Sequence, residues 1–372
     1  MEKPAFLLMI LLAAGLASGE ENCRFFWVSR DALVHPDTLN ALILRAEAAG
    51  ANGLIVQVVG RGEAYYRSEI LPRASYGGYD DPLAYLLAAA KPRGMEIHAW
   101  INAFLVWSSP VPPADSGHVW HSRPEWFLGH VSGKSSRDFT PGEAEAAGLV
   151  GATLSPALPE VRAFVASIAE EIALNYPVEG IHLDYVRYPG PSFGFEPGAV
   201  ALFYNETGCL PRNSPEVWKR WRADQVGMTV ETVRFRLNSS APATLLSCAV
   251  MPNPATAYGD FGCPWREWLD RGLVDFVCPM AYTPDRSRSR ALAAGALAEN
   301  SGDVVYGVAV YNQPVASALE SASGALALGA GGICVYSLNS LPAGGEFELA
   351  GFWGTGSPRH EYGPHLFHMV AA

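Results

Sequence analysis

The sequence predicts a (β/α)8 barrel, and three observations lead to that fold class. Eight apolar, β-type runs follow one another along the chain. Helical patterns separate them, and strands that alternate with helices in this way are typical of a TIM barrel. The length of 372 residues, of which 49% are hydrophobic, suffices for one such domain. An open doubly wound sheet is the alternative, but no GxGxxG motif follows the first expected strand.

The elements follow in a regular order. The expected strands are 25–29, 53–59, 95–102, 178–186, 243–251, 273–281, 303–310 and 331–337. The expected helices lie at about 37–49, 80–93, 158–175, 213–238, 288–299 and 314–328. In the third of these, Val161, Val165 and Ile168 recur at helical spacing behind Pro159. Long loops at about 104–157 and 189–212 follow the third and fourth strands, and loops of that length are usually functional.

The first nineteen residues have the composition of a signal peptide. Lys3 precedes an apolar stretch at 5–16, and small residues at 17–19 follow it. The stretch is shorter than the ~20 residues that a transmembrane helix needs. We therefore expect a signal peptide at 1–19, a single barrel catalytic domain at 20–372, and a secreted or periplasmic protein. No stable membrane insertion is expected after cleavage of the signal.

Charge and cysteine content exclude several classes of function. The net charge of −11, without any Lys/Arg run, argues against nucleic acid as a partner. No CxxC motif or paired Cys/His spacing is present, so neither a metal nor another cofactor is expected. Three cysteines lie in strands, where a buried thiol is expected, and a disulfide among the other three (Cys23, Cys209 and Cys263) stays open. The chain has no HxH on its first strand, which argues against amidohydrolase chemistry.

Polar side chains gather at the carboxyl ends of several strands, where barrel enzymes carry their active sites. Residues two apart on a strand share a face, so Gly180, His182 and Asp184 are expected to point into the barrel. The same argument, extended to the loops that follow, brings further residues toward the mouth: Gln57, Arg61, Glu63, His98, Trp100, Asn102, Tyr185, Arg187, Asp260, Tyr282 and Asp285. Trp107 joins them from the first long loop.

Several carboxylates around a polar, aromatic cleft indicate glycoside hydrolysis, in which one carboxylate attacks or activates water and another protonates the leaving oxygen. Asp184 is the expected nucleophile or base. Asp285 is the first candidate for the general acid, followed by Glu63, with Asp260 behind them. The other mouth residues would bind sugar, and His182 would keep Asp184 ionised. The structural alternatives are an Asp184–Arg187 ion pair, a packed core histidine at 182 and solvated loop charges at Glu63 and Asp260.

One stretch of the sequence resembles a known protein family. The segment 154–189, which ends in "GIHLDYVRYP", resembles the glycoside-hydrolase-like family 10 proteins, which are secreted bacterial barrels. Similar pieces at 53–72, 94–104 and 274–285 extend the resemblance over nearly the whole mature chain. The resemblance implies a hydrolase of sugar polymers, and some relatives act on the glycan strands of peptidoglycan. Glu63 is a departure, because relatives tend to have Asp there.

The expectation is therefore an exported glycoside hydrolase that cleaves O-glycosidic bonds in a polysaccharide, with peptidoglycan glycan strands as a candidate substrate. A non-catalytic glycan-binding barrel at the cell surface is the alternative from another class. A metal-dependent hydrolase of amides is a third, weaker one.

Overall fold

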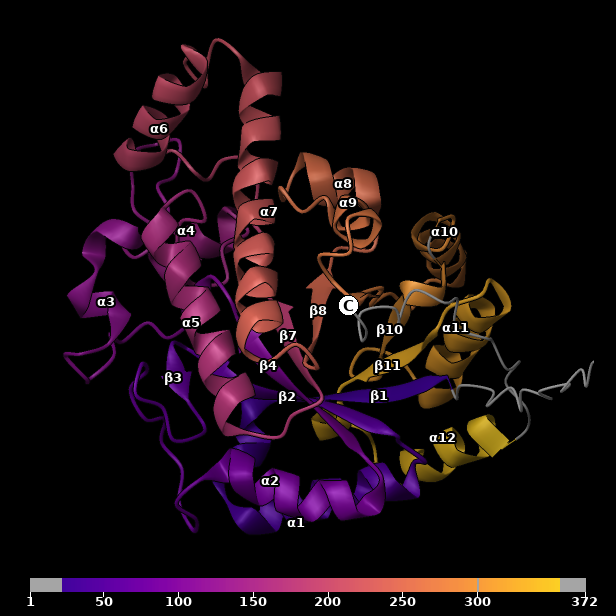
Figure 1. Cartoon of the computed structure of the whole chain (residues 1–372). Coiled ribbons are helices and arrows are strands. Elements are labelled where there is room, and N and C mark those ends of the chain that lie inside the picture. Colours follow the sequence, from indigo (N-terminus) through magenta and orange to yellow (C-terminus); the bar gives the residue numbers. More distant parts are fainter. Residues whose placement is uncertain (1–21, 300, 355–372) are drawn as a thin grey trace, which may run out of the picture.

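The computed structural model describes residues 22–299 and 301–354 and has the expected barrel of eight parallel strands (Figure 1). These strands are β1 (Cys23–Val28), β2 (Gly53–Gly60), β4 (Glu96–Asn102), β7 (Gly180–Asp184), β8 (Leu245–Val250), β9 (Phe276–Pro279), β10 (Val305–Ala309) and β11 (Gly332–Tyr336). Their order in the sheet is β10-β11-β1-β2-β4-β7-β8-β9. Two isolated parallel bridges, Val277 with Val304 and Met280 with Gly307, join β9 to β10 and nearly close the barrel.

Helices cover the outside of the barrel (Figure 1). The long ones are α1 (Pro36–Ala48), α2 (Pro82–Ala90), α5 (Pro159–Asn175), α7 (Pro215–Ser240), α10 (Arg286–Ala296), α11 (Val315–Ala327) and α12 (Gly345–Gly354). Two short helices, α8 (Pro254–Gly259) and α9 (Trp265–Asp270), follow β8. Many of these helices begin with proline, whose fixed φ and missing N–H suit the first helical position.

The two long loops contain short elements that the hydrophobic pattern does not predict. The first loop holds β5 (Leu105–Trp107), α3 (Val119–Ser122), α4 (Pro141–Ala146) and β6 (Ala152–Thr153), and the second holds α6 (Pro197–Thr207). The buried carboxylate of Glu196 joins the loops, because it accepts hydrogen bonds from the backbone N–H of Gly129 (2.8 Å) and from the hydroxyl of Ser155. A further short strand, β3 (Glu63–Ala64), pairs with the end of β2.

The barrel interior is packed in layers. In the lowest layer the His98 ring lies between Phe25 and Phe276, at centroid distances of 5.1 and 5.5 Å. Gly180 faces His98 across the β4–β7 pair. Its missing side chain makes room for the imidazole, since a Cβ at this position would overlap His98.

Gly180→Ala should therefore destabilise the protein by about 1–3 kcal/mol, the usual cost of overpacking a core. Urea unfolding would measure this change. Gly324→Ala is the matched control, because Gly324 lies in α11 with open space around its Cα. That variant should be neutral or more stable by up to about 1 kcal/mol, since alanine favours helix. Equal stability of Gly180→Ala and the wild type would contradict the packing described here.

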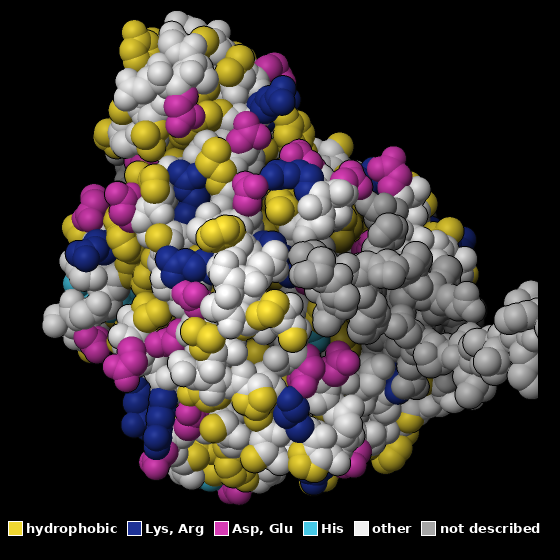
Figure 2. All heavy atoms as spheres, in the orientation of Figure 1, with side chains coloured by type: hydrophobic (Ala, Val, Ile, Leu, Met, Phe, Trp, Pro, Cys, Tyr) yellow, Lys and Arg dark blue, Asp and Glu magenta, His cyan; other side chains and the backbone are white. Residues whose placement is uncertain are grey.

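The signal peptide, the disulfide and the membrane insertion considered in the sequence analysis can be compared with the structure. The expected signal peptide at 1–19 lies outside the described residues. None of the six cysteines, all of which lie within the described residues, is joined in a disulfide, so the one left open among Cys23, Cys209 and Cys263 does not form in this structure. None of the helices within 22–299 and 301–354 is long and apolar enough to cross a membrane. Acidic and basic side chains are interspersed over the face drawn in Figure 2.

Candidate active site

A cleft of about 400 Å³ opens at the carboxyl end of the barrel strands. Seven residues expected at the mouth line it: Gln57, Trp100, Asn102, Asp184, Tyr185, Arg187 and Tyr282. They come from β2, β4, β7 and the segments that follow β7 and β9. The structure thus brings together side chains that are more than two hundred residues apart in the chain.

Asp184 ends β7 and lies at the centre of this group. One carboxylate oxygen, Oδ1, accepts hydrogen bonds from the backbone N–H of Tyr185 (2.6 Å) and from the Arg187 guanidinium (3.1 Å). The other, Oδ2, has no hydrogen-bond partner among the described residues. Tyr185 has a φ of +51°, in the left-handed region that non-glycine residues seldom adopt. Asp184 is therefore held rigidly through one oxygen, which leaves the other for a substrate or a water.

An amide pair forms the adjoining wall of the cleft. Asn102 Oδ1 accepts hydrogen bonds from Trp100 Nε1 (2.9 Å) and from Gln57 Nε2 (3.2 Å). Gln57 Oε1 in turn accepts from the backbone N–H of Arg30 (3.3 Å). Asn102 lies opposite Asp184 in the β4–β7 register. The network fixes both amides beside Asp184, where they suit recognition of sugar hydroxyls.

Aromatic rings form the opposite wall. Tyr282 stacks on Tyr336 with ring centroids 5.2 Å apart, and Trp27 meets Tyr282 edge-on at 6.1 Å. Tyr311 packs edge-on against both tyrosines. Burial is the main cause that raises the pKa of Tyr336, and the nearby negative charge of Asp184 is the second. The Tyr336 hydroxyl therefore stays neutral. Such a wall offers apolar ring faces together with hydroxyl donors, a combination that suits sugar rings.

His182 lies one layer below Asp184 and does not support it. Its Nε2 accepts a hydrogen bond from Trp27 Nε1 (3.3 Å), and its Nδ1 lies 2.8 Å from the hydroxyl oxygen of Ser247. Burial, together with a smaller effect of the neighbouring His98, lowers the pKa of His182 to about 3. The ring is therefore neutral at pH 7. The expectation that His182 keeps Asp184 ionised is wrong, because both of its nitrogens bond elsewhere and it carries no charge.

This buried neutral histidine should make stability depend on pH. An unfolded histidine binds a proton below about pH 6.5, whereas folded His182 does so only near pH 3, so stability is complete above pH 6.5 and falls as the pH decreases. The His182 share of the loss between pH 7 and pH 5 is about 1–2 kcal/mol. Urea unfolding of the wild type and of His182→Gln at both pH values would measure it. Equal pH dependence in the two proteins would contradict this assignment.

Two expected carboxylates lie elsewhere. Asp285, the first candidate for the general acid, caps α10 by accepting from the backbone N–H groups of Ser287 and Arg288. These hydrogen bonds lower its pKa, whereas a proton donor needs a raised one. Asp260 is exposed at the end of α8. Neither residue lines the cleft, so the structure argues against both expected roles.

Other expected residues lie around the cleft or below it. His98 is fully buried in the lowest layer, too deep for the sugar contact expected of it. Arg61 reaches the rim, where its Nε donates to Ser108 Oγ (3.2 Å). Glu63 is half-buried beside Arg61, and burial raises its pKa although the two nearby arginines, Arg61 and Arg30, oppose that shift. Trp107 lines an adjoining cavity instead of the cleft.

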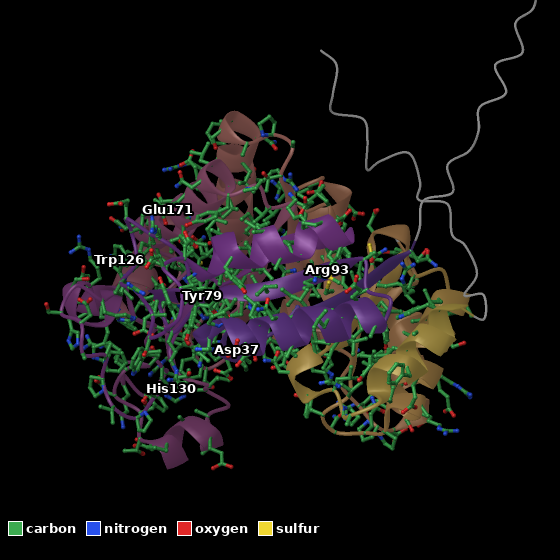
Figure 3. The ribbon with its side chains drawn as sticks, turned by 90° about the horizontal axis from the view of Figure 1, so that it is seen from below. Asp37, Tyr79, Arg93, Trp126, His130 and Glu171 are labelled. Atoms are coloured by element: carbon green, nitrogen blue, oxygen red, sulfur yellow. The ribbon has the colours of Figure 1, made fainter. Side chains whose placement is uncertain are left out.

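Trp126 and His130, two residues of the first long loop, lie on the same side of the molecule in Figure 3. The Trp126 ring packs against Phe164 at 5.6 Å, and the His130 ring packs against Phe193 at 5.1 Å. Neither residue lines the cleft. Both therefore anchor the loop to the rest of the protein.

The most important residue that sequence reasoning missed is Asp31. It directly follows β1 in a 3-10 helix at Arg30–Val34 and lines the cleft together with Ser29 and Arg30. Asp31 and Asp184 are the carboxylates among the described residues that line the cleft. Tyr336 at the end of β11 and Tyr311 after β10 were missed as well. The rule that chemistry lies at the carboxyl ends of strands would have found these residues if it had been applied to the first and the last two strands.

The described residues contain no group of three or more His, Cys, Asp or Glu side chains arranged to hold a metal ion. The chemistry of the cleft is instead that of two carboxylates, amides, arginines and aromatic rings.

A comparison with protein families agrees with this geometry. The model of one family, glycosyl hydrolase-like 10, matches residues 23–311, which include every strand of the barrel except β11. The chain belongs to this family. The resemblance seen in the sequence is thereby confirmed.

Glycosyl hydrolase-like 10 relatives include "Glycosyl hydrolase DigH" of Escherichia coli (strain K12), which is 25% identical over 284 residues, covering 65% of this chain and 57% of the relative. "Glycosyl hydrolase YngK" of Bacillus subtilis (strain 168) is 24% identical over 258 residues, covering 63% of this chain and 46% of the relative. The chain thus spans about half the length of the curated relatives that it matches.

Solved structures share the fold. The PgaB (BpsB) glycoside hydrolase domain from Bordetella bronchiseptica superposes with a TM-score of 0.68 at 18% identity, covering 88% of this chain and 98% of that one. The catalytic domain of β-amylase from Paenibacillus polymyxa has a TM-score of 0.56 at 12% identity, covering 87% and 94% of the two chains. At such identities the likeness concerns the barrel fold alone. The family is shown by the sequence model, and the solved structures add the fold.

Proposed function

We propose that this protein is an exported glycoside hydrolase that cleaves O-glycosidic bonds within a polysaccharide. The observation that carries the proposal is the Asp184 carboxylate, held through Oδ1 at the carboxyl end of β7 while Oδ2 stays available in the cleft. The amides and aromatic rings around it suit the hydroxyls and the faces of sugar rings. The composition of residues 1–19 supports export.

In the proposed mechanism Asp184 acts as the nucleophile or as the base that activates water. Arg187 and the backbone N–H of Tyr185 hold the carboxylate in place, because both donate hydrogen bonds to Oδ1. Asp31 is our proposed proton donor for the leaving oxygen, since it is the other carboxylate of the cleft.

Peptidoglycan glycan strands are the first substrate to test. The support is the resemblance seen in the sequence, together with exported location, which would give the protein access to the cell wall. The cleft itself supports a polymer more generally, because it is open at the barrel mouth and adjoins a second cavity.

The test is incubation of the purified mature protein with a panel of peptide-free peptidoglycan strands, chitin, cellulose, xylan and starch, followed by measurement of released reducing ends. Release from at least one polymer, with loss of the release in Asp184→Asn, is the expected result. Saturable binding to a polymer without any release would instead favour the non-catalytic glycan-binding barrel.

A further inference from the structure

A second cavity, of about 560 Å³, lies next to the cleft and is larger than it. It is formed by the first long loop, between β5, β6 and α4, and Figure 1 shows α3 and α4 on the side of the barrel where α5 lies. Ser108 and Val150 line both cavities. The two cavities therefore adjoin at these residues, at the side of the cleft that faces the first long loop.

The boundary between the cavities is held in place by contacts. Arg61 donates from Nε to Ser108 Oγ (3.2 Å), and its guanidinium lies 5.9 Å from the centre of the Trp107 ring. Trp107 Nε1 in turn donates to the carbonyl oxygen of Val111 (2.8 Å). The boundary is thus built from side chains of the loop that are held by Arg61 and by the loop backbone.

The walls of the second cavity combine aromatic rings with a guanidinium that stacks on rings but has no hydrogen-bond or ion-pair partner among the described residues. Trp107, Trp120 and Phe139 line it. Arg137, which also lines it, lies with its guanidinium 4.8 Å from the centre of the Trp120 ring and 5.1 Å from that of Phe127. Within the described part of the chain, the Arg137 guanidinium makes neither a hydrogen bond nor an ion pair, and its Nε is buried.

The Arg137 guanidinium is thus preorganised to donate hydrogen bonds to a ligand. Stacking on two rings fixes its plane, so little side-chain freedom is lost when it donates hydrogen bonds to a ligand. Ring faces beside an oriented donor are what a sugar needs, since a sugar presents an apolar face and a rim of hydroxyls.

We propose that the second cavity is a subsite for sugar rings of the same glycan chain, remote from the bond cleaved at Asp184. The proposal rests on the proposed function, because it takes the ligand of the cleft to be a glycan. Binding energy from remote parts of a substrate serves catalysis only when the substrate is long enough to reach them. Long chains should therefore be cleaved more efficiently than short ones, and the second cavity should be the reason.

The test compares two probes, peptide-free peptidoglycan fragments of four and of eight sugars, through the ratio of their kcat/KM values. The wild type should prefer the longer fragment by about tenfold or more, as expected when remote binding contributes. Ala144→Trp fills the second cavity from α4, and Arg137→Met removes the donors while it keeps an apolar side chain against Trp120. Each variant should lower the preference at least several-fold.

The matched control is Val217→Trp, which adds the same ring at an exposed position of α7 that lines neither cavity. It should keep the wild-type preference, and thermal melting would show that all variants fold. An undiminished preference in both Ala144→Trp and Arg137→Met would overturn the subsite while leaving the proposed function intact.

If neither fragment is cleaved, hydrolysis of this glycan is rejected. A second measurement then tests the subsite separately from the proposed function. Calorimetric titration then measures how tightly each fragment binds without being cleaved, and the difference in affinity between the two fragments reports on the second cavity. Tighter binding of the eight-sugar fragment that is lost in Ala144→Trp would support the subsite. Absence of binding, or equal affinity for both fragments, would overturn it.

Discussion

Asp184→Asn should fold and lose at least about a thousandfold in the rate of glycan cleavage, the loss expected when a nucleophile or general base is removed. The amide oxygen of asparagine can still accept from the Tyr185 N–H and from Arg187, so the local turn should survive. The change removes the negative charge and the basic oxygen of residue 184 but keeps the size and shape of its side chain. Reducing-end release from the polymer identified by the panel measures the rate, and circular dichroism with thermal melting checks the fold.

Asp285→Asn is the matched control for that variant. It makes the same chemical change at a carboxylate that caps α10, and asparagine is as good an N-cap as aspartate. Because Asp285 does not line the cleft, this variant should retain activity within about twofold, in the range of changes far from the chemistry. If Asp285→Asn were as impaired as Asp184→Asn, the proton donor expected from the sequence would stand and the assignment made from the cleft would fall. Near-full activity of Asp184→Asn would reject the mechanism itself.

Asp31→Asn should lower the cleavage of the natural glycan by about a hundredfold or more, the usual contribution of a general acid. The loss should be much smaller for an aryl glycoside of the same sugar, because a good leaving group departs without protonation. The dependence of the effect on the leaving group distinguishes a lost proton donor from a general disturbance of the cleft. Steady-state kinetics on both substrates measures it.

Glu63→Gln provides the comparison. Glu63 is half-buried with a raised pKa, which suits a donor, but it lies outside the cleft lining, beside Arg61. We expect Glu63→Gln to affect both substrates alike and only modestly. A loss that depends on the leaving group in Glu63→Gln but not in Asp31→Asn would transfer the donor role to Glu63.

The sequence predicted the barrel well because strands and helices alternate with strong hydrophobic patterns. Each of the eight expected strands overlaps a barrel strand, and the six expected helices overlap α1, α2, α5, α7, α10 and α11. The short elements β5, α3, α4 and β6 of the first long loop escaped because two to six residues carry too little periodicity to be recognised. The same loop builds the second cavity, which the hydrophobic pattern did not predict.

The alternation of side chains between the two faces of a strand identified which residues point into the barrel, but not in which layer of the barrel interior they lie. His98 and Asn102 share a face of β4, yet His98 packs against Phe25 in the lowest layer whereas Asn102 lines the cleft. Depth depends on the register of neighbouring strands, which pairs His98 with Gly180 and Asn102 with Asp184. Register results from closing the barrel, so it cannot be read from one strand.

The sequence by itself determined the barrel, the place of Asp184 at the end of its fourth strand, and the family resemblance. Only the tertiary structure decided which residues accompany Asp184. The turn after β9 makes Asp285 a helix cap, and closure of the barrel brings Asp31 after β1 and Tyr336 from β11 into the cleft. The physical reason is that local patterns fix the direction of a side chain relative to its own strand. The neighbours that it meets depend on packing between segments that are distant in the chain.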